Sequence, residues 1–160
     1  MEQQREALLR QIWAAQDEAY DLMYEYDSLP HQYGETTLYQ SEAHIIDLIG
    51  EHPEITVTEL ASTLKKTPSA CSQIVRKLRA KGWVEQVRNT ENNRVFNLHL
   101  TESGQRVYQD HTAFNRSCQE ATFRLLESFS NEELMRHLEV QRKLNEAYQD
   151  DVKNSREHHS

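Results

Sequence analysis

Residues 67–83, TPSACSQIVRKLRAKGW, carry hydroxyl, amide and cationic side chains but no carboxylate. They lie within a longer stretch, Leu60 to Val84, that also contains no Asp or Glu. Hydroxyl and amide groups can hydrogen-bond base edges, and guanidinium groups bind guanine or phosphate. A carboxylate in the same place would repel a phosphate backbone. The residue types of this segment therefore suit the binding of a nucleic acid.

A helix over residues 67–81 would separate these side chains by type. At 100° per residue, one face collects Cys71, Ile74, Val75 and Leu78. Lys77 lies at the border, and the opposite face carries Ser69, Ser72, Gln73, Arg76 and Arg79. With the helix cap and two later cations added, the predicted DNA contacts are Thr67, Ser69, Ser72, Gln73, Arg76, Lys77, Arg79, Arg88 and Arg94.

The charge of this region is opposite to that of the chain. The whole chain has a formal charge of −8, from 26 Asp and Glu against 18 Lys and Arg. Residues 65–94 contain eight Lys and Arg but only two Glu, a net charge of +6, so the remainder carries −14. A local basic patch is what DNA binding requires, because counterion release depends on the contact surface. A merely solvated basic helix face is the alternative.

Three helices are predicted in the middle of the chain. Ser41 is expected to cap a helix that ends near Gly50. Thr58 is expected to cap the next helix, and Thr67 caps a third that Gly82 ends. A short helix, a tight turn and a second helix form the helix-turn-helix unit, whose second helix enters the DNA major groove.

A two-stranded hairpin is predicted directly after these helices. The segments WVEQV and RVFNLHL flank a polar tip, NTENN, and Arg94 is expected to enter the second strand. That strand has the period-2 pattern of a half-buried strand, with Val95, Asn97 and His99 alternating against Phe96, Leu98 and Leu100. A hairpin in this place predicts a winged helix and favours DNA binding over a solvated helix face.

Long amphipathic helices are predicted near both ends. Residues 2–27 have apolar positions spaced alternately by four and three: Leu8, Ile12, Ala15, Ala19, Leu22 and Tyr26. A helix capped by Thr101 repeats this spacing with Val107, His111, Phe114, Cys118, Ala121 and Leu125. Ser130 and Glu133 form a capping box for a last helix, which carries Leu134, Leu138, Leu144 and Tyr148. With only 4 Gly and 3 Pro, the predicted fold is mainly α with a small β-hairpin wing.

The segment ITVTELASTLKKTPSACSQIVRKLRAKGWVEQVRNTENNRVFNLHLTESG resembles the winged-helix core of the MarR (multiple antibiotic resistance regulator) family. The resemblance rests on the ELA helix, SQIVRKL, KGWVE, an Arg at the wing tip and LTESG. It implies a ligand-responsive homodimeric repressor that presents two recognition helices and two wings to a palindromic operator. In that family the wing Arg enters the minor groove, and Arg94 takes this place. An Asp usually stands two residues earlier, where this chain has Asn92.

One MarR-like domain is predicted over residues 1–150. Its winged-helix core covers about 41–101, and its dimerisation helices cover about 2–28 and 102–150. Residues 151–160 are predicted to be a frayed polar tail. The two seams provide more apolar surface than a small winged helix needs, which favours a homodimer. The alternative is that both seams pack within one chain.

The effector is open among an organic ligand, an acyl compound, a metal and an oxidant. The favoured interpretation is an organic or acyl ligand between the first, second and fifth helices, near Trp13, Tyr20, Tyr24, His44, His111 and Phe114. The same aromatics could instead be core residues. No cofactor or metal is predicted; the weaker zinc hypothesis takes as ligands His31, Glu35, His44 and His111. Among these, His44 and His111 match positions used in zinc-responsive members of the family the chain resembles.

Other function classes have less support in the sequence. Cys71 and Cys118 match no CxxC pattern, and neither shows the exposure and lowered pKa that a redox sensor needs. The chain has no Gly-rich phosphate loop, nucleophile elbow or HExxH motif, so we predict no enzyme. It has no apolar run of the roughly 18 residues that span a bilayer and no signal-peptide pattern, so we predict a cytoplasmic protein without a membrane partner. The remaining alternative is a winged-helix protein-interaction module without specific DNA readout.

Overall fold

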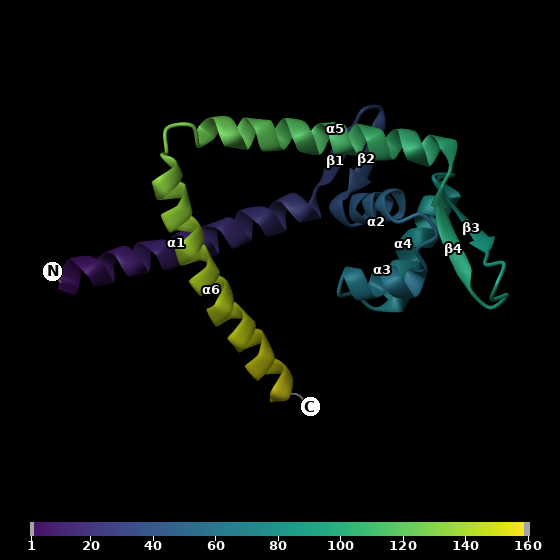
Figure 1. Ribbon diagram of the computed structural model, residues 1–160. Coiled ribbons are helices and arrows are strands. Elements are labelled where there is room, and N and C mark those ends of the chain that lie inside the picture. The colour runs from purple at the N-terminus through teal and green to yellow at the C-terminus, as the bar shows by residue number, and fades with distance from the viewer. Residues whose placement is uncertain (1, 159–160) are drawn as a thin grey trace. The chain divides into compact units, whose positions relative to one another are not determined.

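The structure is a computed structural model that describes residues 2–158 (Figure 1). Its elements are α1 (Glu2–Ser28), β1 (Pro30–Tyr33), β2 (Thr36–Tyr39), α2 (Gln40–Glu51), α3 (Val57–Thr63), α4 (Pro68–Ala80), β3 (Val84–Arg88), β4 (Phe96–Leu100), α5 (Glu102–Leu125) and α6 (Asn131–Glu157). The chain divides into two compact units, Met1–Asn115 and Arg116–Ser160, so that α5 begins in one and ends in the other. The predicted mainly α fold with a small wing is confirmed.

The core of the first unit lies where α2, α3 and α4 meet the two hairpins. The side chains of Ile45, Ile46, Leu60, Leu78 and Leu98 are fully buried there. α2 packs against α4 and β4, and α3 packs against α4. Burial of a large apolar side chain contributes about 1.5–3 kcal/mol. The helix-turn-helix is therefore held by a common core with the wing.

Residues 30–39 form a first hairpin that is not among the elements predicted from the sequence. β1 and β2 pair antiparallel, and Gly34 makes the turn at φ 56°. Tyr33 and Leu38 are buried, so the hairpin supplies two large side chains to the core. The short strands escaped detection because four residues are too few to establish an alternating pattern.

Two predicted helix caps are wrong. α2 begins at Gln40 rather than after Ser41, because β2 leads directly into it. The cap of α3 is Thr56 rather than Thr58. The Thr56 backbone N–H and hydroxyl donate to Glu59 Oε2 at 2.8 and 2.7 Å, and the Glu59 backbone N–H donates to the Thr56 hydroxyl at 3.2 Å. Glu59 stands three residues after Thr56 and so completes a capping box.

The C-terminus of α4 is fixed by local geometry. Gly82 has φ 76°, the left-handed conformation that glycine adopts without a Cβ clash. The Gly82 N–H donates to the Arg79 carbonyl at 2.9 Å, and the Trp83 N–H donates to the Leu78 carbonyl at 3.0 Å. These two bonds form a Schellman motif. The predicted helix end at Gly82 is confirmed, and the chain turns there into the wing.

A close backbone approach joins the start of α5 to the base of the wing. A Cβ on Gly104 would lie 1.9 Å from the Trp83 carbonyl oxygen, so only glycine fits. The Thr101 hydroxyl accepts from the Gly104 N–H at 3.1 Å, as the predicted cap requires, and donates to the Gly82 carbonyl at 2.6 Å. The LTESG segment therefore positions α5 against the end of α4.

The second wing strand is shorter than predicted. β4 begins at Phe96, so Arg94 lies in the preceding turn rather than in the strand. Phe96 is 43% exposed whereas Asn97 is 9% exposed, which departs from the predicted alternation. The reason is a third segment beside β4: the Leu98 N–H donates to the Ile55 carbonyl at 2.9 Å.

The final helix corrects the prediction of a frayed tail from residue 151. α6 begins after Ser130, whose predicted capping box with Glu133 is present, and it continues to Glu157. Residues 131–157 contain neither Gly nor Pro, so no residue type ends the helix earlier. Within residues 2–158, no helix is long and apolar enough to cross a bilayer.

Candidate nucleic-acid interface

The recognition helix α4 has the two faces expected from its sequence. Cys71, Val75 and Leu78 are buried against the core. On the other side, Ser72 is half-buried and the remaining predicted contacts are exposed: Ser69, Gln73, Arg76, Lys77 and Arg79. An exposed row of hydroxyl, amide and cationic groups on a rigidly packed helix can reach the floor and the walls of a DNA groove.

Thr67 positions the start of this helix. Its hydroxyl oxygen accepts a hydrogen bond from the Ala70 N–H at 3.2 Å, and Pro68 occupies the first helical turn, as predicted. The cap shows that Thr67 sets where the helix begins. The exposed residues that follow are therefore presented from a defined first turn.

Arg79 has a partner within the chain. Its Nη1 donates to Gln86 Oε1 on β3 at 2.7 Å. This bond ties the last turn of α4 to the wing, which the sequence did not indicate. Near by, Lys81 Nζ lies 3.0 Å from the largely buried carboxylate of Glu42 and 4.7 Å from the ring centre of Trp83. These two cations thus hold α4 against its neighbours.

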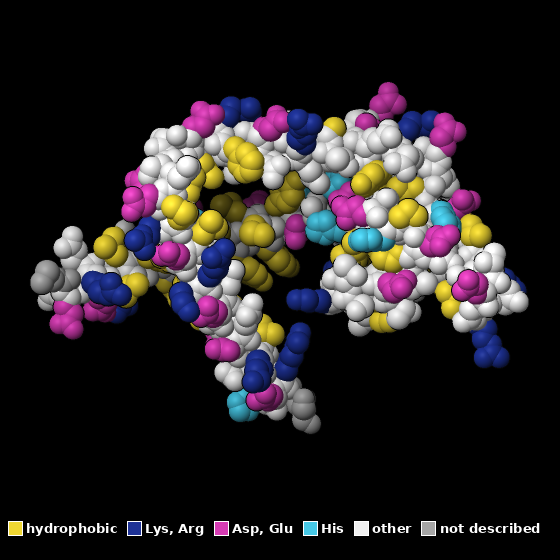
Figure 2. All heavy atoms as spheres, viewed as in Figure 1, with side chains coloured by type: hydrophobic (Ala, Val, Ile, Leu, Met, Phe, Trp, Pro, Cys, Tyr) yellow, Lys and Arg dark blue, Asp and Glu magenta, His cyan; other side chains and the backbone are white. Residues whose placement is uncertain are grey.

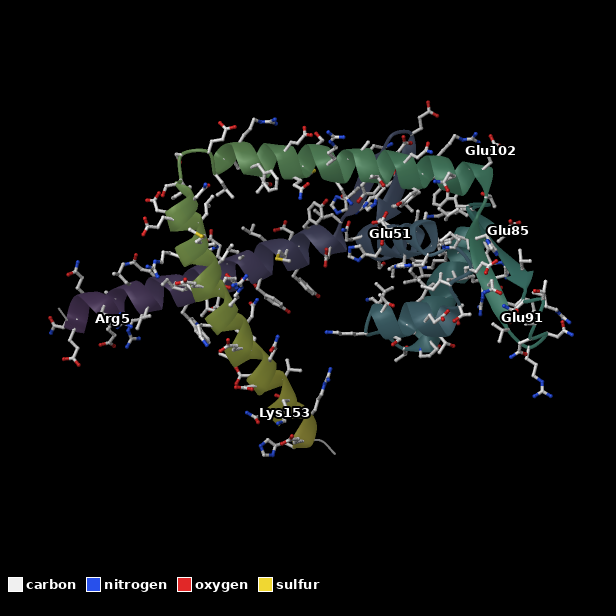
Figure 3. The ribbon with its side chains drawn as sticks, in the orientation of Figure 1. Arg5, Glu51, Glu85, Glu91, Glu102 and Lys153 are labelled. Atoms are coloured by element: carbon white, nitrogen blue, oxygen red, sulfur yellow. The ribbon has the colours of Figure 1, made fainter. Side chains whose placement is uncertain are left out.

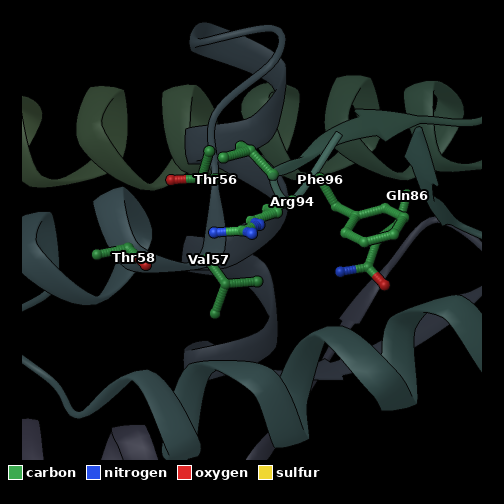
Figure 4. Close-up of a pocket in the computed structure, with 7 residues that line it drawn as sticks. Thr56, Val57, Thr58, Gln86, Arg94 and Phe96 are labelled. Carbon is green, nitrogen blue, oxygen red and sulfur yellow. The ribbon is translucent and has the colours of Figure 1, made fainter. Parts of the chain in front are cut away.

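The wing carries the other two predicted cations. The Arg88 guanidinium lies 5.6 Å from the ring centre of Phe96, a cation–π distance that keeps it over the outer face of the hairpin. Arg94 lines a cavity of about 410 Å³ between the wing and the start of α3, together with Thr56, Val57, Thr58, Gln86, Val95 and Phe96. Figure 4 shows the Arg94 side chain running from the hairpin toward α3. The Arg94 side chain is exposed, and it borders the start of α3.

The cations are distributed along one continuous region of the chain. Figure 2 shows Lys and Arg side chains projecting from the helix-turn-helix region and from the wing. The two carboxylates of residues 65–94, Glu85 and Glu91, lie on β3 and at the hairpin tip (Figure 3). Neither lies on α4. The recognition helix itself therefore presents cations without a competing carboxylate.

The predicted effector pocket is only partly assembled. Trp13, Tyr20 and Tyr24 are 55%, 68% and 70% exposed on α1. Tyr20 and Tyr24 stack on each other at 6.4 Å between ring centres. His44 is exposed on α2, where its Nε2 lies 3.0 Å from Gln40 Nε2. None of these four side chains lines the cavity beside Arg94. None lines a second cavity, of about 350 Å³, between the α2–α3 connection and α3.

The other two predicted pocket residues do lie together. His111 is fully buried, and its Nδ1 lies 2.7 Å from Asp47 Oδ1. Tyr33 meets the rings of His111 and Phe114 edge-on, at 4.7 and 5.0 Å between centres. His111 Nε2 is buried and has no hydrogen-bond partner in the part of the chain that the structure describes. The cluster joins β1, α2 and α5, so these aromatics pack as core within the first unit.

The candidate metal ligands do not lie together in the structure. Among residues 2–158, no group of three or more His, Cys, Asp or Glu side chains is placed to hold a metal ion. Each histidine has its own neighbour: His31 Nε2 lies 2.8 Å from the Tyr26 carbonyl oxygen, while His44 and His111 have the partners described above. The weaker zinc hypothesis at His31, Glu35, His44 and His111 is therefore not supported by the geometry.

The cysteines differ in environment. Cys71 is buried in α4, and burial raises the pKa of its thiol, with a smaller opposing effect of the Lys66 charge. A raised pKa leaves less thiolate, which is the reactive form. Cys118 is exposed on α5, although its place in the apolar seam predicted burial. Cys71 is thus a packing residue of the recognition helix.

Sequence reasoning did not single out several residues that shape the interface. Gln86 accepts from Arg79 and also lines the cavity beside Arg94. Asn97 donates to the Glu54 carbonyl, 43 residues away in the chain. The sequence signal for the role of Asn97 is an asparagine within a predicted strand, because Asn is depleted in strands.

The helix-turn-helix, the hairpin after it and the exposed basic face define a winged helix-turn-helix protein. Residues 38–96 match the model of the MarR family. This match agrees with the resemblance of the motifs, and the solved structures described below share the fold.

Three similar proteins illustrate this relationship. The uncharacterized HTH-type transcriptional regulator YpoP of Bacillus subtilis (strain 168) is 29% identical over 107 residues, which are 67% of this chain and 74% of YpoP. Streptococcus pneumoniae FabT, solved in complex with DNA, has a TM-score of 0.70 at 24% identity, over 89% of this chain and 98% of FabT. The zinc-responsive MarR family member ZitR of Lactococcus lactis has a TM-score of 0.75 at 21% identity, over 88% of this chain and 99% of ZitR.

Proposed function

We propose that this protein is a sequence-specific, double-stranded-DNA-binding transcriptional regulator. The observation that carries the proposal is the exposed face of α4, on which Gln73, Arg76 and Lys77 stand free of carboxylates while the opposite face is locked in the core. The recognition helix would enter the major groove, with Gln73 and Arg76 on base edges. Arg94 would reach the minor groove from the wing.

The match of residues 38–96 to the MarR family model supports the proposal of a regulator and of a homodimer. Large apolar side chains stand exposed on the terminal helices, including Leu22 at 60% and Leu138 at 52%. Exposed apolar patches of this kind mark surfaces that bind a partner. A dimer would place two recognition helices on the two halves of a palindromic operator, one helical turn apart.

The finer parts of the proposal follow from the same role. A regulator of transcription acts where the chromosome is, so we place it in the cytoplasm, as a DNA-binding protein rather than an enzyme. We further propose that it is a repressor released by an effector, as the likeness to MarR regulators suggests. The effector class that we propose is an organic or acyl compound.

Selection of bound duplexes from a random pool tests the DNA-binding proposal. We expect recovery of a palindromic sequence with half-sites about one helical turn apart. Affinity for the selected duplex should fall by about 10³–10⁵ between 50 and 200 mM salt if 6–10 phosphates are contacted. Recovery of no common sequence, with weak binding that ignores salt, would instead identify a protein-interaction module.

Release of the selected duplex tests the effector proposal. The complex is titrated with a panel of fatty acyl and aromatic compounds, and in parallel with zinc and with a mild oxidant. We expect an organic or acyl compound to release the DNA. Release by zinc alone, or by oxidation alone, would overturn the preferred effector class while leaving the DNA-binding proposal intact.

A further inference from the structure

Side-chain amides form a continuous relay through the wing. At one end, Asn97 is 9% exposed and its Nδ2 donates to the Glu54 carbonyl in the α2–α3 connection. Its Oδ1 accepts from Asn89 Nδ2 at 2.9 Å. Asn89 Oδ1 in turn accepts from the backbone N–H groups of Glu91 and Asn92, both at 2.9 Å. The hairpin tip is thus attached to the helix-turn-helix through two amide side chains.

The relay ends at the wing arginine. Asn92 Oδ1 accepts from the Arg94 backbone N–H at 3.1 Å. The Val95 N–H donates to the Asn92 carbonyl at 2.9 Å, and the Asn89 N–H donates to the Val95 carbonyl at 3.0 Å. The backbone on both sides of Arg94 is therefore tied into the tip. Among residues 2–158 the guanidinium has no carboxylate partner, and it lines the cavity beside α3.

The direction of every bond in the relay follows from its anchor. The Glu54 carbonyl can only accept, so Asn97 must present its NH₂ group and keep its oxygen for Asn89. Asn89 must then donate, which leaves its oxygen for the two backbone N–H groups. Glu54 itself has φ 75°, an uncommon conformation for a residue with a Cβ. Its N–H donates to the Leu98 carbonyl at 3.3 Å, so the anchor is held by β4 from both sides.

We propose that Asn97, Asn89 and Asn92 are positioning residues that set the wing arginine for minor-groove readout. This inference rests on the proposed function. Position 92 of this chain is an Asn and not an Asp, and neutral amides hold the tip. They fix the backbone of Arg94 and leave the charge of its guanidinium available to the DNA. Preorganisation of the tip lowers the ordering cost that binding must meet. Because Asn97 is bonded to Glu54, the α2–α3 connection also helps to position Arg94 for DNA binding.

The test uses the full-length protein and the duplex selected above, flanked either by A·T pairs or by G·C pairs. Asn97→Asp keeps the size of the side chain but turns an oxygen toward the Glu54 carbonyl. Asn93→Asp is the matched control, since it adds the same charge to an exposed tip residue with no side-chain hydrogen bond. Asn92→Ala removes only the acceptor for the Arg94 N–H, and Asn93→Ala is its control. All four changes are also made with Arg94→Ala.

We expect Asn97→Asp and Asn92→Ala each to weaken binding to the A·T-flanked duplex by about fivefold, the usual effect of one hydrogen bond. Beside Arg94→Ala, the same changes should cost less than about twofold, because they act through that side chain. Hydrogen exchange at the Arg94 and Val95 amides of the free protein should accelerate in both variants. The two Asn93 controls should match the wild type in exchange and in flank preference.

Equal losses with and without Arg94, or unchanged exchange at the tip, would overturn the positioning role. Asn92→Ala decides the question if Asn97→Asp unfolds the wing, because Asn92 is exposed and supports no core contact. A wild-type protein that selects no duplex overturns the proposed function, and the positioning role with it. If the wild type binds the selected duplex and the variants keep its preference for A·T flanks, the positioning role alone is overturned.

Discussion

The recognition helix and the terminal helices have similar amphipathic sequences but opposite surroundings. α4 buries three residues in 13, whereas α1 and α6 bury none of their 27 residues each. In α4 the rest of the first unit covers the apolar face. In α1 and α6 the apolar side chains stay exposed in the single chain, with Trp13 at 55% and Met135 at 58%.

This difference shows that an apolar helix face does not by itself indicate whether the same chain or a second chain covers it. The face of α4 is complemented by α2, α3 and the wing, so its stability belongs to the monomer. Faces without such a complement gain stability only from association, which makes that stability depend on protein concentration. The recognition helix is thus held independently of assembly, while the spacing between two such helices would depend on it.

The largest expected effect comes from charging the terminal helices. Leu22→Glu combined with Leu138→Glu should convert a dimer to monomers in sedimentation experiments. Operator affinity should then fall by about 10²–10⁴, because the two half-sites are no longer bound by one linked particle. Asp17→Lys changes the charge on the face of α1 opposite the apolar seam and should leave the dimer intact. A double variant that still sediments as a dimer would remove α1 and α6 from the interface.

Truncating the buried face of α4 should produce the next largest effect. Leu78→Ala should lower the free energy of unfolding by about 2–5 kcal/mol, since Leu78 is fully buried. Urea unfolding at two protein concentrations measures this, with Leu138→Ala as the comparison. We expect the Leu78 loss to be the same at both concentrations and the Leu138 loss to vary. Equal concentration dependence in both variants would erase the distinction between the two kinds of helix.

The exposed face of α4 should affect DNA binding rather than folding. Arg76→Ala should weaken operator binding by about 1–3 kcal/mol and relax preference at one base pair, if the guanidinium contacts a guanine edge. Thermal unfolding should be nearly unchanged. Arg116→Ala, an exposed arginine paired with Glu120 on α5, is the control. The same loss of affinity on specific and nonspecific duplexes would reassign Arg76 to a phosphate contact.

The smallest expected effect concerns the capping box of α3. Hydrogen bonds from the Thr56 backbone and hydroxyl lower the pKa of the Glu59 carboxyl below its ordinary range. Because the folded-state pKa is lowered, this stabilisation is present above about pH 4.3 and is lost as the pH falls through the folded-state value. Glu59→Gln should therefore reduce stability at pH 7 by less than about 1 kcal/mol, since the site is exposed. Urea unfolding should show this difference in stability shrink as the pH is lowered below about 4.3.

Local patterns in the sequence determined the recognition helix and several helix ends. The cap at Thr67, the end at Gly82 and the box at Ser130 are all present in the structure. Each depends on residues no more than five positions apart, so the chain itself supplies the partners. The separation of α4 into an apolar and a cationic face followed from helical periodicity for the same reason.

Only the tertiary structure decided which distant groups meet. Asn97 and Glu54 are 43 residues apart, Lys81 and Glu42 are 39 apart, and His111 and Asp47 are 64 apart. Residue type could not predict these pairs, because Asn, Lys and His side chains can each bond to many different partners. The folding of the core determines which backbone and side-chain groups lie near β4 and α2. The sequence by itself determined the DNA-facing chemistry of α4, and the fold decided how the wing is held beside it.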